Sequence, residues 1–411
     1  MKQKNKIYYI ILILTTLIGM WVLPTLVKKI TYKPDSYPFV YYSCMLNDLC
    51  FIEYSNKKTP MQDTKGNIYT TSQFDSLMPM LNFRQLMSDG RLPDSIKGIA
   101  IEPRIIRSKM VNYKYSPNET ATPQIGLYIL FEAMPKRVGI EMPDDVFRIK
   151  DKIEFINTGT NSVNKEKSKL FQAAMDKEGY TFPTQWASGN LNPRKPYDEG
   201  YFCLDAKGEL YHLKMVNERP YLKNTHISDS IDIAHFAMLE VADKRFYGFL
   251  YSKTGEMYII ENEGGGYKTV KLDIDPINLQ QDQIILMGNI FDWTVSVITP
   301  ESKKCYGLDA ASLKRIAEHD IDRTPGKWDK VSKWIFPAYI TIESKSSDYL
   351  LPAFHFTAFT ALLINFLLAL GIGLFVQNTT RKRLFNFTFV LITGIAGFVA
   401  LLILPGLRKK Y

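Results

Sequence analysis

The sequence predicts a mainly β protein that is attached to a membrane by three helices. Uncharged apolar runs lie near both ends of the 411-residue chain, and runs of this kind are typical of membrane helices. Between them, apolar and polar residues alternate in short runs separated by Gly, Asn, Asp and Pro, a pattern typical of antiparallel strands and turns. Hydrophobic residues make up 46% of the chain and charged residues 23%, so we expect the central region to bury a core.

The N-terminal apolar run, residues 7–27, contains no charged residue over 21 positions. A helix of that length just spans a hydrocarbon core of ~30 Å. The lysines that precede the run would also suit a cleaved signal peptide. Because the run is longer than a usual signal-peptide core and no small-residue cleavage site follows it, the sequence favours an uncleaved anchor over residues 1–34.

Two further uncharged runs, residues 350–376 and 385–404, flank a basic link near the C-terminus. They predict a transmembrane hairpin within residues 349–411. His355 lies in the first run, where an ionisable side chain marks either a functional site or a position among lipid headgroups. Small residues that would let the two helices approach closely are Gly371, Gly373, Gly394 and Gly397.

The net charge of +9 belongs to the ends of the chain. Residues 1–34 and 349–411 each carry six basic residues and no acidic ones, which leaves a net charge of −3 between them. Nucleic-acid binding needs a basic surface, so a slightly acidic central domain excludes this function. Basic residues near a membrane normally stay in the cytoplasm, but here six fall on each side. The lysines before the first run favour a periplasmic domain and an inner-membrane, multi-pass protein.

Hairpin-like patterns recur with a spacing of 47 residues. The turn at residues 205–208 and the turn at 252–255 each end in glycine and are followed by similar strand patterns, and residue 302 falls in a third turn. The segment 63–69 resembles the first of these turns, and residues 39–42 and 50–54 form another plausible hairpin. The period suits a four-stranded propeller blade or a similar stacked β unit. A simple meander of alike hairpins would give the same pattern, so both interpretations stay open.

Helices are few in the central region. Residues 70–77 begin with a capping box, residues 81–88 end at Gly90, and residues 164–178 place apolar side chains on one face before Gly179. A loop rich in Pro, Gly and Asn follows. We therefore expect an α+β part over residues 35–180 and a β-repeat part over residues 181–348.

The sequence contains no motif that assigns catalytic, cofactor-binding or metal-binding residues. Cys44 and Cys50 could form a disulfide across a hairpin, but no C-x-x-C pair occurs, so buried free thiols are the simpler interpretation. The histidines lack metal-ligand spacing and are expected to be structural. The remaining cysteines and histidines are Cys203, Cys305, His212, His226, His235 and His319.

Three short patterns only superficially suggest a binding or catalytic site. Residues 263–269 are glycine-rich, but Tyr267 stands where a phosphate loop needs glycine, which favours a turn. Residues 162–165 read S-x-x-K without the accompanying motifs of a penicillin-binding enzyme, which favours a helix start. The acidic clusters 141–145 and 273–275 could bind calcium or act as a carboxylate pair, but proximity in sequence does not bring carboxylates together in space, which favours solvated turns.

Five segments resemble an uncharacterised family of membrane-anchored proteins of Gram-negative anaerobes. They are 63–69 with 74–77, 90–94, 196–201 and 288–293. Genes of that family tend to lie beside ABC-transporter genes. The resemblance implies no activity, cofactor or site residue, but it favours an accessory role beside an ABC-type transporter.

Two hypotheses about function follow. The first is a non-catalytic, membrane-anchored accessory subunit with an extracytoplasmic β domain, whose partners are the lipid bilayer and other membrane-protein subunits. The second is a membrane-tethered enzyme of the cell envelope, of the hydrolase type. The sequence names no ligand or transported substance.

Overall fold

The protein is described by a computed structural model that covers residues 2–33, 37–53, 61–122, 126–346, 349–375 and 380–404. Its residues form two compact units. The first, here called the β domain, is Tyr37–Asp322. The second, here called the terminal unit, combines the described parts of Met1–Ser36 and Arg323–Tyr411.

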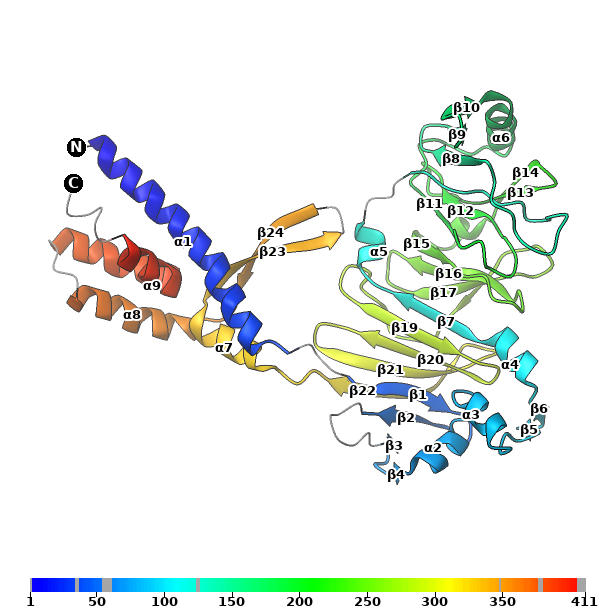
Figure 1. The fold of residues 1–411 in the computed structure, drawn as a ribbon, viewed down its shortest axis with the longest axis horizontal. Helices are drawn as coiled ribbons and strands as arrows, with labels where there is room; N and C mark the ends of the chain where they lie inside the picture. The colour runs from blue at the N-terminus through cyan, green and yellow to red at the C-terminus, as the bar shows by residue number, and fades with distance from the viewer. Residues whose placement is uncertain are drawn as a thin grey trace. The chain divides into compact units, whose positions relative to one another are not determined.

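Five antiparallel sheets make up most of the β domain (Figure 1). Sheet 1 contains β1 (Phe39–Ser43), β2 (Asp48–Ile52), β3 (Met61–Asp63) and β4 (Ile68–Tyr69). Sheet 2 contains β8 (Asp145–Ile149), β9 (Ile153–Asn157) and β10 (Ser162–Asn164). Sheet 3 contains β11 (Trp186–Gly189), β12 (Tyr201–Leu204), β13 (Leu210–Val216) and β14 (Arg219–Asn224).

Sheet 4 contains β15 (Ile233–Met238), β16 (Phe246–Ser252), β17 (Met257–Glu261) and β18 (Lys268–Lys271). Sheet 5 contains β19 (Gln283–Gly288), β20 (Asp292–Ile298), β21 (Ser302–Asp309) and β22 (Arg315–Asp322), and β7 (Val111–Tyr115) pairs with β19 at its edge. A small hairpin joins β5 (Ser95–Ile96) to β6 (Ile99–Ala100).

The sheets lie face to face in the order 2, 3, 4, 5 and 1, and a layer of apolar side chains fills each space between neighbours. Alternation along β12 shows how one strand serves two layers. Tyr201 and Cys203 belong to the layer between sheets 2 and 3, whereas Phe202 and Leu204 belong to the layer between sheets 3 and 4. Successive side chains of a strand point to opposite faces, so a strand covered on both faces is apolar throughout.

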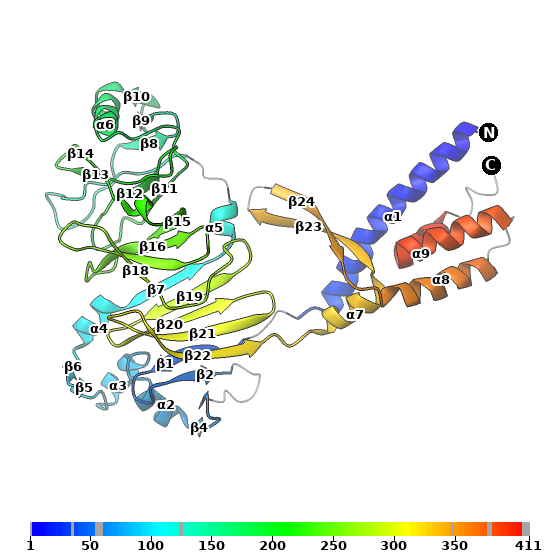
Figure 2. The same cartoon turned by 180° about the vertical axis from the view of Figure 1, so that it is seen from behind.

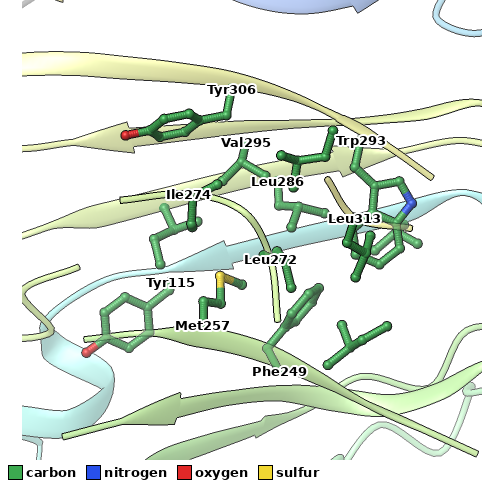
Figure 3. Close-up of a cluster of buried hydrophobic side chains, with 14 of the residues drawn as sticks. Tyr115, Phe249, Met257, Leu272, Ile274, Leu286, Trp293, Val295, Tyr306 and Leu313 are labelled. Carbon is green, nitrogen blue, oxygen red and sulfur yellow. The ribbon is translucent and has the colours of Figure 1, made fainter. Parts of the chain in front are cut away.

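The layer between sheets 4 and 5 is drawn in Figure 3. Phe249 and Met257 from sheet 4 meet Leu286, Trp293 and Val295 from sheet 5. Full burial of a large apolar side chain contributes about 1.5–3 kcal/mol. These layers therefore hold the sheets together.

The 47-residue spacing reflects three hairpin turns that each begin with a side chain accepting backbone N–H groups, of which the first two also share a glycine at positive φ. Asp205, Ser252 and Thr299 begin the central hairpin turns of sheets 3, 4 and 5. Each side chain accepts backbone N–H groups of its own turn, for example Asp205 Oδ1 from Glu209 at 2.9 Å and Ser252 Oγ from Glu256 at 3.0 Å. The predicted repeated hairpins are thus confirmed.

The described sheets form a row with two ends. Sheet 2 and sheet 1 lie at opposite ends of that row in Figures 1 and 2. A propeller closes its blades into a ring, and no such closure is present among the described residues. A mainly β fold of repeated hairpins is confirmed, whereas the propeller interpretation is not.

Two helices in the β domain, α2 and α6, begin at side-chain caps. The predicted capping box is present, because Thr70 and Gln73 cap each other's backbone at the start of α2. Asn164 caps α6 through its side chain, so the S-x-x-K pattern is a helix start. The helices are α2 (Thr71–Leu77), α3 (Phe83–Ser88), α4 (Pro103–Lys109), α5 (Asn118–Ala121), α6 (Lys165–Lys177) and the short η1 (Ile227–Asp229). The domain boundary expected at residue 181 stays a prediction and falls between α6 and β11.

The terminal unit contains two helices, α1 and α9, that are long and apolar enough to cross a membrane. Its elements are α1 (Lys2–Thr31), α7 (Lys327–Ile335), β23 (Ala338–Ser346), β24 (Tyr349–Phe356), α8 (Ala361–Phe375) and α9 (Thr380–Ile403). Close packing joins α1 to α9 at Gly19, where a Cβ atom would lie 3.3 Å from that of Ala396. Gly394 makes room for Asn365 of α8, as expected of a small residue between helices. Among the described residues, no atom lies within 4 Å of a Cβ atom added at Gly371.

The predicted third membrane helix, over residues 350–376, is wrong. Its first part is strand β24, which pairs with β23, and α8 contains only 15 residues. A helix of that length rises about 22 Å, which is less than a hydrocarbon core of ~30 Å. The sequence of the partner strand β23 is polar, so it did not indicate that a hairpin forms here. Hydropathy alone also does not distinguish an apolar strand from an apolar helix. His355 accordingly lies on a strand, beside Tyr339 and Thr341.

Candidate ligand-binding cleft

A cleft of about 620 Å³ lies where the first strands of sheets 2, 3 and 4 come together. Arg148 and Ile149 of β8 line the cleft, as do Thr184 and Gln185 of the loop before β11. The lining also includes residues of β15 and of α5 with its neighbours. The remaining lining residues are Glu119, Thr120, Thr122, Gly126, Tyr128, Lys150, Trp186, Ala234 and His235.

His235 contributes to this cleft a buried nitrogen, Nε2, that has no hydrogen-bond partner. Three aromatic rings surround the imidazole, with ring centres 5.9 Å away for Tyr115, 6.0 Å for Tyr251 and 6.4 Å for Trp186. Burial lowers the pKa of His235 to about 4, so the ring is neutral at pH 7 and offers one donor and one acceptor.

Backbone and side-chain hydrogen bonds fix the rim between sheets 2 and 3. The Thr184 N–H donates to the carbonyl oxygen of Lys150 at 2.7 Å, and Thr184 Oγ1 is bonded to the Tyr180 hydroxyl at 2.7 Å. The Gln185 side-chain amide donates to the Asp205 carbonyl oxygen at 2.9 Å. The cleft is therefore formed before any ligand binds.

Charges of both signs border the cleft. The charge of Arg148 is already paired, because its Nε donates to Glu154 at 2.7 Å. Lys150 is exposed and has no carboxylate partner among the described residues. On the α5 side, the Glu119 carboxylate accepts the N–H of Ser116 at 3.1 Å. The cleft can thus receive a polar molecule, with Lys150 available for an anionic group.

The other predicted histidines have structural surroundings. His212 is fully buried, with Nδ1 2.8 Å from the Tyr267 hydroxyl and Nε2 2.5 Å from the Glu199 carbonyl oxygen. Burial lowers the pKa of His212 to about 3. His226 is exposed beside Asp229, and His319 packs on Phe51.

The predicted clusters of cysteines and acids do not form sites. All four cysteines are buried free thiols, so Cys44 and Cys50 are not bonded to each other. The acidic side chains pair with basic ones: Asp145 binds Lys167 at 2.8 Å. Hydrogen bonds from Lys304 and Arg315 lower the pKa of Asp275 to about 2. No group of three potential metal ligands occurs in the described part of the chain.

A buried charge cluster, which the sequence did not reveal, fixes the loop of residues 190–200 to sheet 4. The Lys195 ammonium lies 2.5 Å from Asp198 Oδ1 and 3.0 Å from Glu240 Oε1, and all three side chains are at most 2% exposed. Glu240 Oε1 also accepts the Glu199 N–H at 2.7 Å. Burial raises the pKa of both carboxyl groups. The cluster is buried and not accessible to a ligand, so its role is structural.

The model of a protein family matches residues 39–308, from the start of β1 into β21. Its description is "Domain of unknown function (DUF4857)". The chain belongs to the DUF4857 family.

The DUF4857 match includes every residue that lines the cleft, whereas the helices of the terminal unit lie outside it. None of the curated proteins matches the sequence. One similar solved structure is titled dihydro-heme d1 dehydrogenase NirN in complex with DHE, with 12% identity over 69% of this chain and 74% of that chain. Its TM-score of 0.22 is too low to support an argument about fold or function.

Proposed function

We propose that this DUF4857 protein is a non-catalytic, membrane-anchored accessory subunit whose β domain binds a small polar molecule. The observation that carries the proposal is the buried, unpartnered Nε2 of His235 in the wall of a preformed cleft. Leaving a buried polar atom unpaired costs about 1–3 kcal/mol, and nearly all such atoms in proteins are satisfied. A ligand that hydrogen bonds to His235 would remove that cost.

The chemistry of the cleft favours a ligand with a flat apolar part and an anionic group. Trp186 and Tyr128 provide aromatic surface, and Lys150 provides an unpaired positive charge at the rim. Pockets for small molecules commonly combine apolar walls with a few polar groups that fix orientation. His235 would orient the ligand because it is neutral and held between rings.

The membrane attachment and its partners complete the proposal. The helices α1 and α9 anchor the chain in the inner membrane, in a multi-pass arrangement with the β domain in the periplasm. Their partners are the bilayer and other membrane-protein subunits, as in an ABC-type transporter. Support comes from the length and apolar character of the two helices and from exposed apolar side chains along α1, such as Ile10, Leu14 and Ile18.

Ligand binding can be tested on the full-length protein purified in mild detergent. We expect native mass spectrometry to detect a bound small molecule on the wild type and on His226→Ala, which changes an exposed histidine away from the cleft. His235→Phe keeps the ring shape but removes Nε2, so the bound mass should be lost. Equal occupancy in His235→Phe would contradict the cleft as the site. Turnover of ligand by the wild type would instead favour the envelope enzyme.

Topology can be tested with an introduced cysteine. Native thiols are buried, Cys44 being only 4% exposed, so an impermeant thiol reagent should not label the wild type. Lys207→Cys lies in an exposed turn of sheet 3. We expect labelling of this variant in cells whose outer membrane alone is permeable. Labelling only after the inner membrane is opened would contradict a periplasmic β domain.

Association with a transporter needs a separate test. Co-purification of an ABC-type transporter with the tagged wild-type chain is the expected result. A chain that migrates alone in mild detergent, in cells whose transport is unchanged by its deletion, would contradict the accessory role. Ligand binding at His235 does not depend on this outcome.

A further inference from the structure

The hairpin of β23 and β24 has one face made entirely of apolar side chains. Paired residues of two antiparallel strands point to the same face, and alternate residues along a strand share a face. The register pairs Ala338 with Phe356, Ile340 with Phe354 and Ile342 with Pro352. With Leu350, two residues before Pro352, these side chains form what we call the apolar hairpin face: Ala338, Ile340, Ile342, Leu350, Pro352, Phe354 and Phe356.

The β24 side of this face is uncovered, whereas Ile340 on β23 is only 8% exposed. The exposed fractions are 72% for Leu350, 62% for Phe354 and 85% for Phe356, and Phe359 just after the strand is 90% exposed. Soluble proteins rarely leave contiguous apolar surface of this kind open to water, and such patches mark contact sites for proteins or membranes.

The opposite face of the hairpin is polar and internally bonded. The His355 ring stacks on Tyr339 with ring centres 4.9 Å apart. The Thr341 hydroxyl lies 2.7 Å from His355 Nε2 and 2.7 Å from Glu343 Oε1. Ala353 and Leu351 are the apolar residues on this side, and Leu351 is 63% exposed. The hairpin is therefore amphipathic across its thickness.

The surroundings of the hairpin favour a lipid surface as its occupant. The chain passes within a few residues from Phe356 into α8, whose exposed side chains include Leu363 and Leu367, and α1 packs against β23. A two-stranded hairpin has two edges of unpaired backbone groups, which cannot lie in hydrocarbon but are satisfied by water at the level of the headgroups. An amphipathic element of this kind lies in the interface with its apolar face toward the acyl chains.

We propose that the apolar hairpin face rests on the bilayer, at the boundary between headgroups and acyl chains, as an interfacial membrane contact next to α8. Phe354 and Phe356 insert among the lipids, while Thr341, Glu343 and His355 face water. This contact holds the start of α8 at the membrane surface. It is independent of ligand binding at His235.

Fluorescence quenching in vesicles tests the proposal on the full-length chain. Single cysteines at Phe354→Cys and Phe356→Cys are labelled with bimane, and Ala353→Cys on the opposite face of the same strand is the matched control. The native thiols are buried and stay unlabelled. In phosphatidylcholine vesicles whose lipids carry a nitroxide near the headgroup, we expect about twofold stronger quenching at 354 and 356 than at 353, because only the apolar face meets lipid.

Aqueous iodide supplies the complementary measurement. It should quench the label at 353 more than the labels at 354 and 356. Equal lipid quenching at all three positions would overturn the proposal. Labels at 354 and 356 that are shielded from both lipid and iodide would also overturn it, because a protein surface would then cover the face. Two positions on the face keep the test valid if one variant folds poorly, as judged by its circular dichroism.

Discussion

The layer around His212 and the cleft around His235 place the same residue type in two different states. Both histidines lie among aromatic rings, and burial lowers both pKa values, to about 3 and about 4. His212 uses both ring nitrogens within the protein, whereas Nε2 of His235 has no partner. Burial and a lowered pKa therefore do not distinguish the two histidines, whereas the unsatisfied Nε2 of His235 beside a cleft does.

The largest expected effect concerns Lys195, whose partner Glu240 accepts the backbone N–H of Glu199, the residue whose carbonyl oxygen contacts His212. Lys195→Met leaves Asp198 and Glu240 buried without their positive partner, which should cost about 3–5 kcal/mol of unfolding free energy. Urea unfolding followed by tryptophan fluorescence would measure it. Lys207→Met, in an exposed turn, is the control and should change stability little. A loss below 1 kcal/mol, roughly the size of a surface ion pair, would show that the cluster is not a structural clamp.

The second prediction concerns His212 directly. His212→Phe preserves the stacking on Phe202, whose ring centre lies 4.5 Å away, but removes the bonds to Tyr267 and to the Glu199 carbonyl oxygen. An unsatisfied buried group costs about 1–3 kcal/mol, so we expect a loss of about 2–3 kcal/mol in the same unfolding experiment. Unchanged stability would mean that His212, like His235, can lose its ring nitrogens without destabilising the protein.

The third prediction uses pH. The folded-state pKa of each histidine lies below the unfolded value of 6.5, so the unfolded chain binds more protons as the pH falls below 6.5, and stability decreases. At pH 5 each histidine should account for about 2 kcal/mol of lost stability relative to pH 7. Asp292 acts in the opposite direction, because burial raises its pKa to about 7.

The histidine contribution is obtained as the difference between the pH profiles of the wild type and of a variant without the ring nitrogens. His212→Phe and His235→Phe should each be less sensitive to acid than the wild type by that amount. A variant whose profile runs parallel to the wild type would show that its histidine titrates normally in the folded chain.

The smallest expected effect belongs to the cleft. His235→Phe removes no hydrogen bond at Nε2 and keeps the aromatic contacts. The free energy of unfolding of the ligand-free protein should therefore fall by less than about 1 kcal/mol or rise, because the variant no longer buries an unpaired polar atom. Thermal unfolding of ligand-free samples checks this result. A loss as large as that of His212→Phe would mean that His235 is structural and would remove the main support for the cleft.

Much of the β architecture was predictable from the sequence because its determinants are local. The glycines Gly208 and Gly255 have φ values of +85° and +87°, which glycine adopts without strain, and this fixed the turns and their 47-residue spacing. Thr70 and Asn164 marked helix starts for the same local reason. Whether the sheets close into a ring depends on long-range packing, which a local pattern does not contain.

The candidate site was much less predictable. His235 was a lone histidine in an apolar strand, and its open nitrogen results from the arrangement of three sheets around it. The buried Lys195 cluster joins residues that are 45 apart in sequence. Hydropathy marked α1 and α9, which are long apolar helices in the structure. It did not separate β24 from α8, because an apolar strand face and an apolar helix have similar average composition.

A row of sheets with two ends differs from a ring in how it can come apart and how it can grow. In the described part of the chain, the apolar layers join each internal sheet to the two sheets beside it, as in a linear repeat protein. At the ends of the row, α6 packs on β9 and α2 packs beside sheet 1. Backbone amides should therefore exchange with solvent fastest in sheets 1 and 2 and slowest in sheet 4. One more unit of 47 residues could also lengthen the row without breaking a closed circle.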